Sequence, residues 1–412
     1  MRRVVVTGLG AVSSLGTDAA TLWENIKKGQ NGIARITAFD PTGFKATLGS
    51  EVRNFDPVDF LDKKEAKRMD RFCQFAMIAS ETAYGDAELE RASIDREKFG
   101  VIIGSGIGGT LTTQAQYLKL LEKGPSRVSP FFVPMSISNI AAGSVAIKLK
   151  AKGICTCIVT ACASSTHAIG EAFHAIRNGL ADVIVSGGAE APISPLAVAG
   201  FINMTALSTS SDPLRASIPF DKERDGFVIG EGAGALILES LEQAQKRNAK
   251  IYAEIVGYGA TCDAYHITAP PEGGEGAARA MKLALQDAKI KPEEVSYINA
   301  HGTSTPHNDK SETEAIKKVF GELAYRIPVS SSKSMLGHLL GASGAVEAVI
   351  TVKAVQEDFI PATIGYRVKD EDCDLDYVPN KGRNSQVNYA LSNSFGFGGQ
   401  NSTLVFKKWT GE

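Results

Sequence analysis

Apolar residues fall into two kinds of segment that alternate along the chain. Short runs rich in Val and Ile predict strands, and stretches with apolar residues three or four positions apart predict amphipathic helices. The predicted strands cover residues 3–8, 99–105, 153–161, 181–188, 234–240, 251–259, 294–300, 327–332, 387–393 and 402–408. The predicted helices include 64–86, 110–122, 163–178, 274–288, 308–321 and 342–356. This alternation favours an α/β protein with helices on both faces of its sheets.

Two pairs of similar segments indicate an internal repeat. "VVVTGLGAVSS" from Val4 matches "AEIVGYGATCD" from Ala253, because each is a strand that continues into Gly-x-Gly-Ala. "HAIGEAFHAI" from His167 matches "SGAVEAVITV" from Ser343 in its Glu-Ala pair and helical spacing. The offsets are 253 − 4 = 249 and 343 − 167 = 176 residues, so the first half carries inserted structure. We predict two similar halves, residues 1–250 and 251–412.

The composition is that of an ordinary globular protein. Of 412 residues, 43% are apolar and 22% are charged, and the formal net charge is −2. This balance gives no sign of a nucleic-acid partner, so a charged partner would have to meet a local patch. No apolar run approaches the roughly 18 residues of a membrane helix, and the start of the sequence lacks a signal-peptide pattern. We therefore expect a cytoplasmic protein without membrane insertion.

Cysteine and glycine spacings argue against two common kinds of site. Six Cys occur without a C-x-x-C pair or a Cys/His cluster at zinc spacing, so neither disulfides nor a metal site are expected. Cys155 and Cys157, inside the apolar run "ICTCIV", fit small buried hydrophobes. Gly8-x-Gly10 lacks the third glycine and the later acidic residue of a dinucleotide-binding fingerprint. It predicts a tight turn at the strand exit with close packing instead.

Cys162 stands apart from the other cysteines. In "CIVTACASSTHAIG" it lies where a buried strand ends and small residues open a helix. Strand ends of this kind face the functional crevice of α/β folds, and a helix amino terminus offers unpaired N–H groups and a partial positive charge. Both effects favour the thiolate. Cys162 is therefore a candidate nucleophile, with a buried structural thiol as the alternative.

Two histidines occur in comparable strand-exit segments. His301 lies in "NAHGTST" and His338 in "KSMLGHLLGASG". Either one alone would fit a structural hydrogen-bonding role. Together with the turn at Cys162, they predict three loops that converge on one crevice. His167 and His174, seven residues apart on one face of the helix after Cys162, fit helix packing.

Longer motifs connect these segments with a known family. "TACASS", "NAHGTSTPHNDKSET", "KSMLGHLLGASGAVE" and "NSFGFGGQN" resemble the signatures of the β-ketoacyl-[acyl carrier protein] synthases, in particular the elongating synthase II type. The likeness runs from Arg2 to Lys408 and includes "FDKERDGFVIGEGAG". It implies the thiolase fold, five layers αβαβα built from two similar halves, and a homodimer. The first half would hold the nucleophile with inserted cap and dimer elements, and the second the histidine pair and a gating loop.

The resemblance assigns roles around the thiol. It implies Cys162 as the acyl-accepting nucleophile and His301 with His338 as the pair that supports decarboxylation of a malonyl unit. Two imidazole N–H donors suit that task, because the thioester develops an oxyanion as CO₂ leaves. Lys333 is implied as the cation that keeps the site polar. The backbone N–H groups of Cys162 and Phe397 are implied as a second oxyanion hole for the attack on the acyl thioester.

Further residues are implied around this centre. Phe397 is implied as a gate, since the glycines beside it allow close approach and movement. Glu347 and Phe395 are implied as supporting residues, Glu347 by pairing with Lys333. The alternative for Glu347 is an ordinary charge on a helix surface.

The substrate arm and the acyl chain have candidate contacts. Thr303 and Thr305 lie two residues apart, so their hydroxyls share one side of an extended loop. The resemblance implies that they bind the amides of a phosphopantetheine arm, with Thr268. Ile107 is implied as a wall of the acyl pocket, with Phe201 as the next candidate. Ordinary turn and core residues are the alternatives.

An acidic carrier protein needs a basic surface on this chain. The run "DKKEAKRMDR" spaces its basic residues as on a helix, usually the mark of a solvated face. The resemblance puts carrier docking near this run. The docking candidates are Lys63, Lys64, Lys67, Arg68 and Arg71, extended by Lys123 and Arg127. At Thr205 the family suggests a basic residue, so docking relies more on the first run. No cofactor is expected on the enzyme itself, because phosphopantetheine arrives on the acyl carrier protein.

The sequence therefore predicts a condensing enzyme of fatty-acid elongation. It would join an acyl group on Cys162 to malonyl carrier protein by decarboxylative Claisen condensation. Thiolases use a second cysteine in the C-terminal glycine loop, and "SNSFGFGGQN" has none. A type III initiating synthase would show Asn at His338, and chain-length-factor subunits lack the nucleophile. A polyketide ketosynthase uses the same core chemistry and stays open, as does the preferred acyl chain length.

Overall fold

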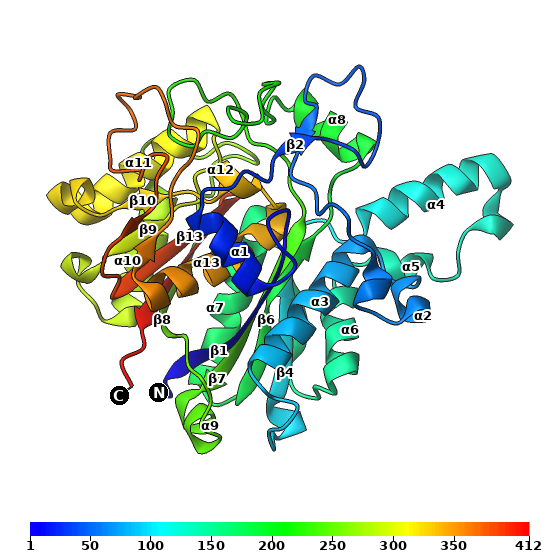
Figure 1. Cartoon of the computed structure of the whole chain (residues 1–412), viewed down its shortest axis with the longest axis horizontal. Coiled ribbons are helices and arrows are strands. Elements are labelled where there is room, and N and C mark those ends of the chain that lie inside the picture. The colour runs from blue at the N-terminus through cyan, green and yellow to red at the C-terminus, as the bar shows by residue number, and fades with distance from the viewer. Residues whose placement is uncertain (412) are drawn as a thin grey trace.

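Ten strands form one continuous sheet to which both halves of the chain contribute. The computed structural model describes residues 1–411, and its strand order is β10-β9-β13-β14-β8-β1-β7-β6-β4-β5 (Figure 1). The first half supplies β1 (Val4–Val12), β4 (Phe99–Gly104), β5 (Cys155–Ile158), β6 (Val183–Glu190) and β7 (Gly232–Ser240). The second half supplies β8 (Ala253–Cys262), β9 (Tyr297–Asn299), β10 (Val329–Ser330), β13 (Tyr389–Gly396) and β14 (Gln400–Lys408). β1 and β8 pair antiparallel at the centre, and the same sequence of antiparallel and parallel pairings runs outward from each.

Helices cover these strands in three layers. α7 (Ser164–Arg177) and α13 (Ser343–Glu357) lie in the apolar core between the two halves. α3 (Arg71–Asp86) and α6 (Ile140–Leu149) cover the outer face of the first half. α10 (Glu275–Ala288) and α11 (Pro306–Phe320) cover the outer face of the second. These are the five layers αβαβα that the resemblance to the β-ketoacyl synthases implied.

Two glycine pairs let helices pack closely on the central strands. A side chain on Gly10 would place a Cβ 1.9 Å from the carbonyl oxygen of Ala79 in α3. A Cβ on Gly259 would lie 2.0 Å from the carbonyl oxygen of Ala280 in α10. The repeated Gly-x-Gly therefore serves helix contact, and the predicted close packing is confirmed. The predicted turn is wrong, because β1 continues through both glycines to Val12.

The central helices correspond as the repeat predicted, but in a different register. Each follows a short 3₁₀ turn, η4 (Ala161–Ala163) before α7 and η8 (Leu340–Ala342) before α13. The first residue of each turn has a φ of +48°. The turns are 340 − 161 = 179 residues apart, three more than the 176 of the sequence match. Helical periodicity thus produced a match nearly one turn out of register. The division at residue 250 stays a prediction.

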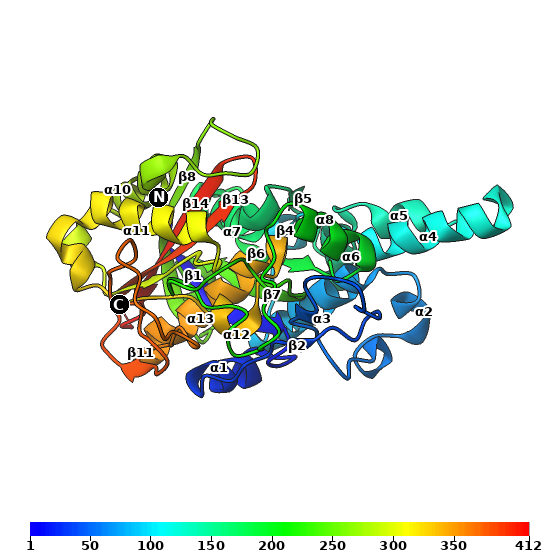
Figure 2. The ribbon, with the colours of Figure 1, turned by 90° about the horizontal axis from the view of Figure 1, so that it is seen from above.

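The remaining elements surround this core. They include α1 (Ala19–Lys27), α2 (Lys63–Ala66), α8 (Pro195–Asn203), α9 (Leu241–Lys246), α12 (Lys333–Leu336), β2 (Ala34–Arg35) with β3 (Leu48–Gly49), and β11 (Phe359–Ile360) with β12 (Arg383–Asn384). α4 (Thr110–Lys123) and α5 (Phe132–Ser136) form an arm, residues 110–136, that projects from the body (Figures 1 and 2).

Two details of the first half correct the sequence prediction. The helix predicted over 64–86 is interrupted, because α2 ends at Ala66 and Asp70 caps α3 by accepting the Phe72 N–H. Cys155 is exposed and Cys157 half-buried, because β5 is an edge strand of the sheet. An apolar run does not reveal which strand forms an edge. No helix within residues 1–411 is both long and apolar enough to cross a bilayer.

Candidate active site

Cys162 lies in a tight turn between β5 and α7. Ala161, just before it, has a left-handed φ of +48°, a strained conformation for a residue with a side chain. The Ser164 hydroxyl locks the turn, since it accepts the Thr160 N–H at 2.9 Å and donates to the Ala161 carbonyl at 2.6 Å. The thiol is thereby held at the start of α7 and is 8% exposed.

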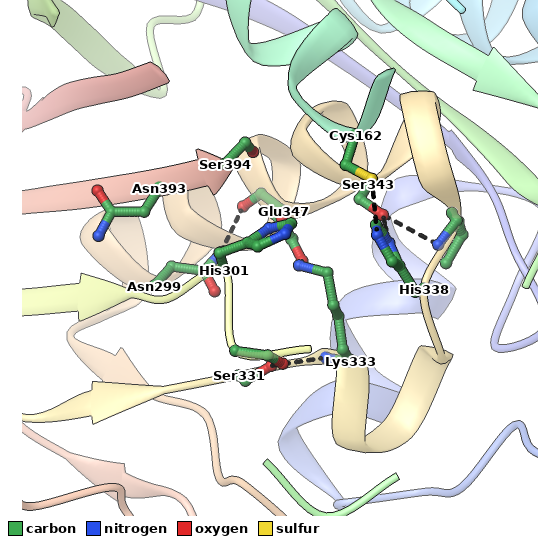
Figure 3. Close-up of polar contacts among 12 residues, drawn as sticks. Cys162, Asn299, His301, Ser331, Lys333, His338, Ser343, Glu347, Asn393 and Ser394 are labelled. Atoms are coloured by element: carbon green, nitrogen blue, oxygen red, sulfur yellow. Dashed lines mark hydrogen bonds and ion pairs between the residues drawn. The ribbon is translucent and has the colours of Figure 1, made fainter. Parts of the chain in front are cut away.

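The Cys162 thiol contacts one histidine and lies near two backbone N–H groups. Its Sγ lies 3.1 Å from His338 Nε2 (Figure 3). The N–H groups of Phe397 and of Cys162 itself are close enough to the sulfur to lower its pKa. Burial raises the thiol pKa to about 11, although Lys333 and these N–H groups act to lower it. The predicted preference for the thiolate is therefore wrong, because desolvation outweighs the helix amino terminus.

His338 is held by partners on both sides. Its Nδ1 lies 2.9 Å from Ser343 Oγ, which also accepts the Leu339 N–H at 2.9 Å. The His338 N–H donates to the Val228 carbonyl at 2.7 Å, so its backbone is fixed as well. A hydroxyl both donates and accepts, so Ser343 supports either neutral tautomer of the imidazole.

His301 follows β9 and faces His338, with ring centroids 5.5 Å apart and planes at 84°. The Glu312 carboxylate accepts the N–H groups of His301 and Gly302 at 2.9 and 2.8 Å, which fixes the backbone behind the imidazole. Burial, and then the charge of Lys333, hold the pKa values of both histidines well below their usual range. Both are therefore neutral at physiological pH, each with one N–H and one lone pair.

Lys333 and Glu347 form a buried ion pair beside the histidines (Figure 3). The Lys333 ammonium contacts Glu347 Oε1. Burial raises the pKa of Glu347, and Lys333 lowers it. The pair expected from the sequence is present, and Glu347 is not a surface charge. Asn299 Oδ1, Glu347 Oε2 and Ser392 Oγ are buried without a hydrogen-bond partner among the described residues. No three His, Cys, Asp or Glu side chains gather as a metal site within residues 1–411.

The glycine-rich loop between β13 and β14 covers the thiol. Gly396 has no room for a side chain, since a Cβ would lie 2.7 Å from the Thr160 carbonyl oxygen. Phe395, near the end of β13, has its ring centroid 5.6 Å from that of His301. The loop thus brings the Phe397 N–H near the sulfur, and Phe395 packs against one of the two histidines. Its role as a gate stays a prediction.

The threonines predicted for the pantetheine arm lie on two loops. The Thr303 and Thr305 hydroxyls are 2.9 Å apart, as their spacing predicted. Thr268 lies on a second loop, which the glycine-rich loop joins through a hydrogen bond from the Gly398 N–H to the Ile267 carbonyl at 2.8 Å. The binding role of the three threonines stays a prediction.

The residues predicted for the acyl pocket lie on separate segments. Ile107, at the exit of β4, is 42% exposed, so it is not an ordinary core residue of this chain. Phe201 in α8 packs 5.4 Å from the ring of Phe227, which lies 5.1 Å from the ring of His338. Phe201 therefore does not contact His338 directly, because the ring of Phe227 lies between them. Both pocket roles stay predictions.

The basic residues predicted for carrier docking are exposed except for Arg71, but they do not lie on one helix. Lys63 and Lys64 belong to α2, whereas Lys67 and Arg68 follow its end. Arg71 is not free to dock a partner, because it is bonded to Glu231 at 2.7 Å. Lys123 is the last residue of α4 and Arg127 lies in the turn that follows, and α4 lies apart from α2 in both views (Figures 1 and 2).

Three hydrogen-bonding residues were missed in the sequence. Ser343 and Glu312 lie inside the motifs quoted above, but their contacts depend on how η8 and α11 fold back. Glu190, at the end of β6, lies in no quoted motif. Its contacts join segments far apart in the chain.

Comparison with known proteins places these features in a family. The profile of the beta-ketoacyl synthase N-terminal domain matches residues 1–244, and that of the C-terminal domain matches residues 252–367. The chain is 56% identical over 409 residues to 3-oxoacyl-[acyl-carrier-protein] synthase 2 of Synechocystis sp., covering 99% of this chain and 98% of the relative. It is 53% identical over 408 residues to the protein of the same name from Staphylococcus aureus, covering 99% of each.

Solved structures agree. A type II polyketide synthase acyl-carrier protein in complex with its ketosynthase matches with a TM-score of 0.93 at 39% identity, over 99% of this chain and 100% of that one. A beta-ketoacyl synthase from Burkholderia phymatum matches with a TM-score of 0.92 at 37% identity, over 99% and 100%. The predicted thiolase fold is confirmed. Since both domain profiles match and relatives share more than half their residues over nearly the whole length, the chain belongs to the beta-ketoacyl synthase family.

Proposed function

We propose that this chain is a β-ketoacyl-[acyl carrier protein] synthase of fatty-acid elongation. It condenses an acyl group held on Cys162 with malonyl carrier protein to give 3-oxoacyl carrier protein, CO₂ and free carrier protein. The observation that carries the proposal is the 3.1 Å approach of Cys162 Sγ to His338 Nε2, beside the N–H groups of Cys162 and Phe397. A nucleophile, a base and an oxyanion hole thus meet at one point.

In the first half-reaction Cys162 accepts the acyl group. Because burial keeps the thiol protonated, attack on the incoming thioester needs a base at the same moment. His338 with its proton on Nδ1, donated to Ser343 Oγ, has Nε2 free to take the thiol proton. The Cys162 and Phe397 N–H groups stabilise the oxyanion that forms. The pantetheine thiolate leaves and takes the proton from His338, which is neutral again.

In the second half-reaction the malonyl thioester loses CO₂. The electrons of the breaking C–C bond form an enolate, whose oxygen needs N–H donors. His338 now donates from Nε2 while Nδ1 accepts from Ser343, and His301 is the second donor. Because both imidazoles are neutral, they donate hydrogen bonds without protonating the carbanion. The enolate carbon attacks the acyl carbon on Cys162, and the thiolate leaves and takes up a proton from water.

Lys333 acts on this site through its charge. It lies beside both histidines and the thiol, and its effect on all three pKa values is to lower them. The ion pair with Glu347 holds the ammonium in place and offsets the cost of burying it. The cation therefore helps to keep the imidazoles neutral in both half-reactions.

Mass spectrometry of the acylated protein tests the proposal. Octanoyl carrier protein should place one acyl group on the peptide that contains Cys162, and malonyl carrier protein should then convert it to 3-oxodecanoyl carrier protein. Cys157→Ala is the matched control, because it removes a neighbouring thiol and should still be acylated. An acyl group on another residue, or one retained in Cys162→Ala, would contradict the assignment.

A second copy of the chain and the acyl carrier protein are the proposed partners. Large apolar side chains are exposed on the arm, directly after it and directly after β5, namely Tyr117, Leu118, Leu121, Val133, Ile137 and Val159. Such a patch next to an edge strand is typical of a protein interface. We therefore propose a homodimer that buries the arm and β5. Sedimentation of a monomer at micromolar concentration would contradict it. Cytoplasmic location stays a prediction, and no cofactor held by the chain itself takes part in the proposed reaction.

A polyketide ketosynthase is the second candidate, because the structure matched with a TM-score of 0.93 belongs to a polyketide system. Identity favours elongation, at 53–56% to the 3-oxoacyl synthases against 39% to the polyketide ketosynthase. A competition between saturated and poly-β-keto acyl carrier proteins separates the two. Preference for the poly-β-keto substrate would overturn the first candidate.

A further inference from the structure

Glu190 is a buried carboxylate at the end of β6 for which the mechanism above has no use. It accepts four hydrogen bonds. Oε1 accepts from the Ser105 hydroxyl at 2.9 Å and the Ile107 N–H at 3.2 Å. Oε2 accepts from the Gly106 N–H at 2.6 Å and the Gly341 N–H at 3.0 Å. All four donors are neutral, namely one hydroxyl and three backbone N–H groups. The Glu190 carboxylate therefore holds backbone segments in place and does not neutralise a neighbouring cation.

These donors join two loops of the active site. Ser105, Gly106 and Ile107 form the turn at the exit of β4, and Gly341 lies in η8, three residues after His338. Both loops pack closely against the Glu190 side chain, because a Cβ added to Gly106 or Gly341 would lie 2.8 or 2.6 Å from Oε2. Glu190 thus connects the Ile107 turn to the loop that carries His338.

We propose that Glu190 is a positioning residue for acyl-chain selection, acting through Ile107. The inference rests on the proposed function and on Ile107 as a wall of the acyl pocket. With its N–H bound, the backbone of Ile107 cannot retreat, so the wall yields to a long chain only by a change of side-chain rotamer. A β-branched side chain has few rotamers, and each change is a discrete step. Freeing the backbone lets the wall move as a whole and admits longer chains.

Glu190→Gln changes the hydrogen bonds on one side of the carboxylate while the side chain keeps nearly the same volume. The amide keeps one acceptor oxygen, and its NH₂ group must face one of the two pairs of donors. On the Oε2 side it would meet two N–H groups, whereas on the Oε1 side the Ser105 hydroxyl can accept from it. The Gln side chain therefore keeps the hydrogen bonds from the Gly106 and Gly341 N–H groups and loses the hydrogen bond from the Ile107 N–H.

The experiment is a competition among acyl carrier proteins from six to sixteen carbons, with 3-oxoacyl products measured. Glu190→Gln should raise the ratio of kcat/KM for the longest chain over the shortest by about tenfold, in the direction of Ile107→Ala. In the double variant Glu190→Gln/Ile107→Ala, the ratio should equal that of Ile107→Ala alone, because one residue acts through the other. Glu239→Gln is the matched control. Glu239 is a buried carboxylate at the opposite end of the β6–β7 pair, bonded to Thr7 and Arg247, and its variant should leave the ratio unchanged.

Equal losses at every chain length in Glu190→Gln, or additive effects in the double variant, would overturn the inference. Should Glu190→Gln not fold, Ser105→Ala is the second variant, because the same hydroxyl also accepts the Gly108 N–H and so holds the same turn. It should shift the ratio in the same direction by a smaller factor, and an unchanged ratio would overturn the inference. Failure of the unaltered protein to form any 3-oxoacyl product would instead refute the proposed function.

Discussion

Replacing Gly396 by Ala tests the oxyanion hole of the acyl-transfer step without removing a catalytic side chain. The added Cβ would lie 2.7 Å from the Thr160 carbonyl oxygen and 3.3 Å from the Cys162 nitrogen. Ordinary contacts begin at 3.4 Å, so the loop must retreat by roughly 3.4 − 2.7 = 0.7 Å. Oxyanion-hole donors work at about 2.7–3.1 Å, so this retreat carries the Phe397 N–H out of range. We expect acyl transfer to slow by about 10²- to 10³-fold, the cost of one lost donor.

The assay separates the two half-reactions. Single-turnover mass spectrometry follows acylation of Cys162, and release of CO₂ from malonyl carrier protein follows decarboxylation. Decarboxylation should change little in Gly396→Ala, because its donors are the two histidines. Gly398→Ala is the matched control, since it imposes backbone strain at a φ of +86° but meets only the end of the Gln400 side chain, at 3.4 Å. Acyl transfer at the parental rate in Gly396→Ala would refute the role of the Phe397 N–H.

Three further predictions concern the thiol and histidines, the carrier surface and the acyl pocket. Cys162→Ala should abolish acyl transfer and condensation, whereas Cys162→Gln, whose amide resembles the acylated state, should still decarboxylate malonyl carrier protein. His301→Ala or His338→Ala should slow CO₂ release by roughly 10²-fold or more. A parental rate of CO₂ release in either variant would contradict the proposal that this histidine donates to the enolate. Charge reversal at Lys63, Lys64, Lys67 and Arg68 should raise the KM for acyl carrier protein and flatten its salt dependence, with little effect on a free acyl-pantetheine. Equal losses on both substrates would place docking elsewhere. Ile107→Ala should favour long acyl groups and Ile107→Phe short ones, each by about 10- to 100-fold in relative kcat/KM. An unchanged length profile in both would make Phe201 the next candidate.

The residues proposed as catalytic could be predicted because they lie where the pattern of the chain changes. Cys162 and His301 follow segments that read as strands, and the ends of strands in α/β folds face a common crevice. The long motifs around them then supplied the roles of His338 and Lys333. The structure brings Cys162 to His338 and Lys333 to Glu347, as those motifs implied.

Contacts that depend on packing were not predictable. Glu190 bonds to Gly106 and Gly341, which are 84 and 151 residues away, and no local pattern connects such segments. The error over the thiol pKa has a related cause. A helix amino terminus can be recognised in the sequence, but desolvation depends on what closes over the sulfur. The break between α2 and α3 shows the same limit, because helical periodicity continues past Ala66, where α2 ends, and through Asp70, which caps α3.

The two halves repeat one turn and put it to different uses. η4 and η8 both begin with a left-handed residue and open a central helix. Their offset of 179 makes Gly341 the counterpart of Cys162, since 162 + 179 = 341. In the first half this position carries the thiol, whereas in the second its N–H is bound by Glu190 at 3.0 Å. A side chain would not fit there, because a Cβ on Gly341 would lie 2.3 Å from the Gly106 nitrogen. The turn at η4 therefore has room for a side chain at this position, whereas the turn at η8 does not and instead supports the loop that carries His338.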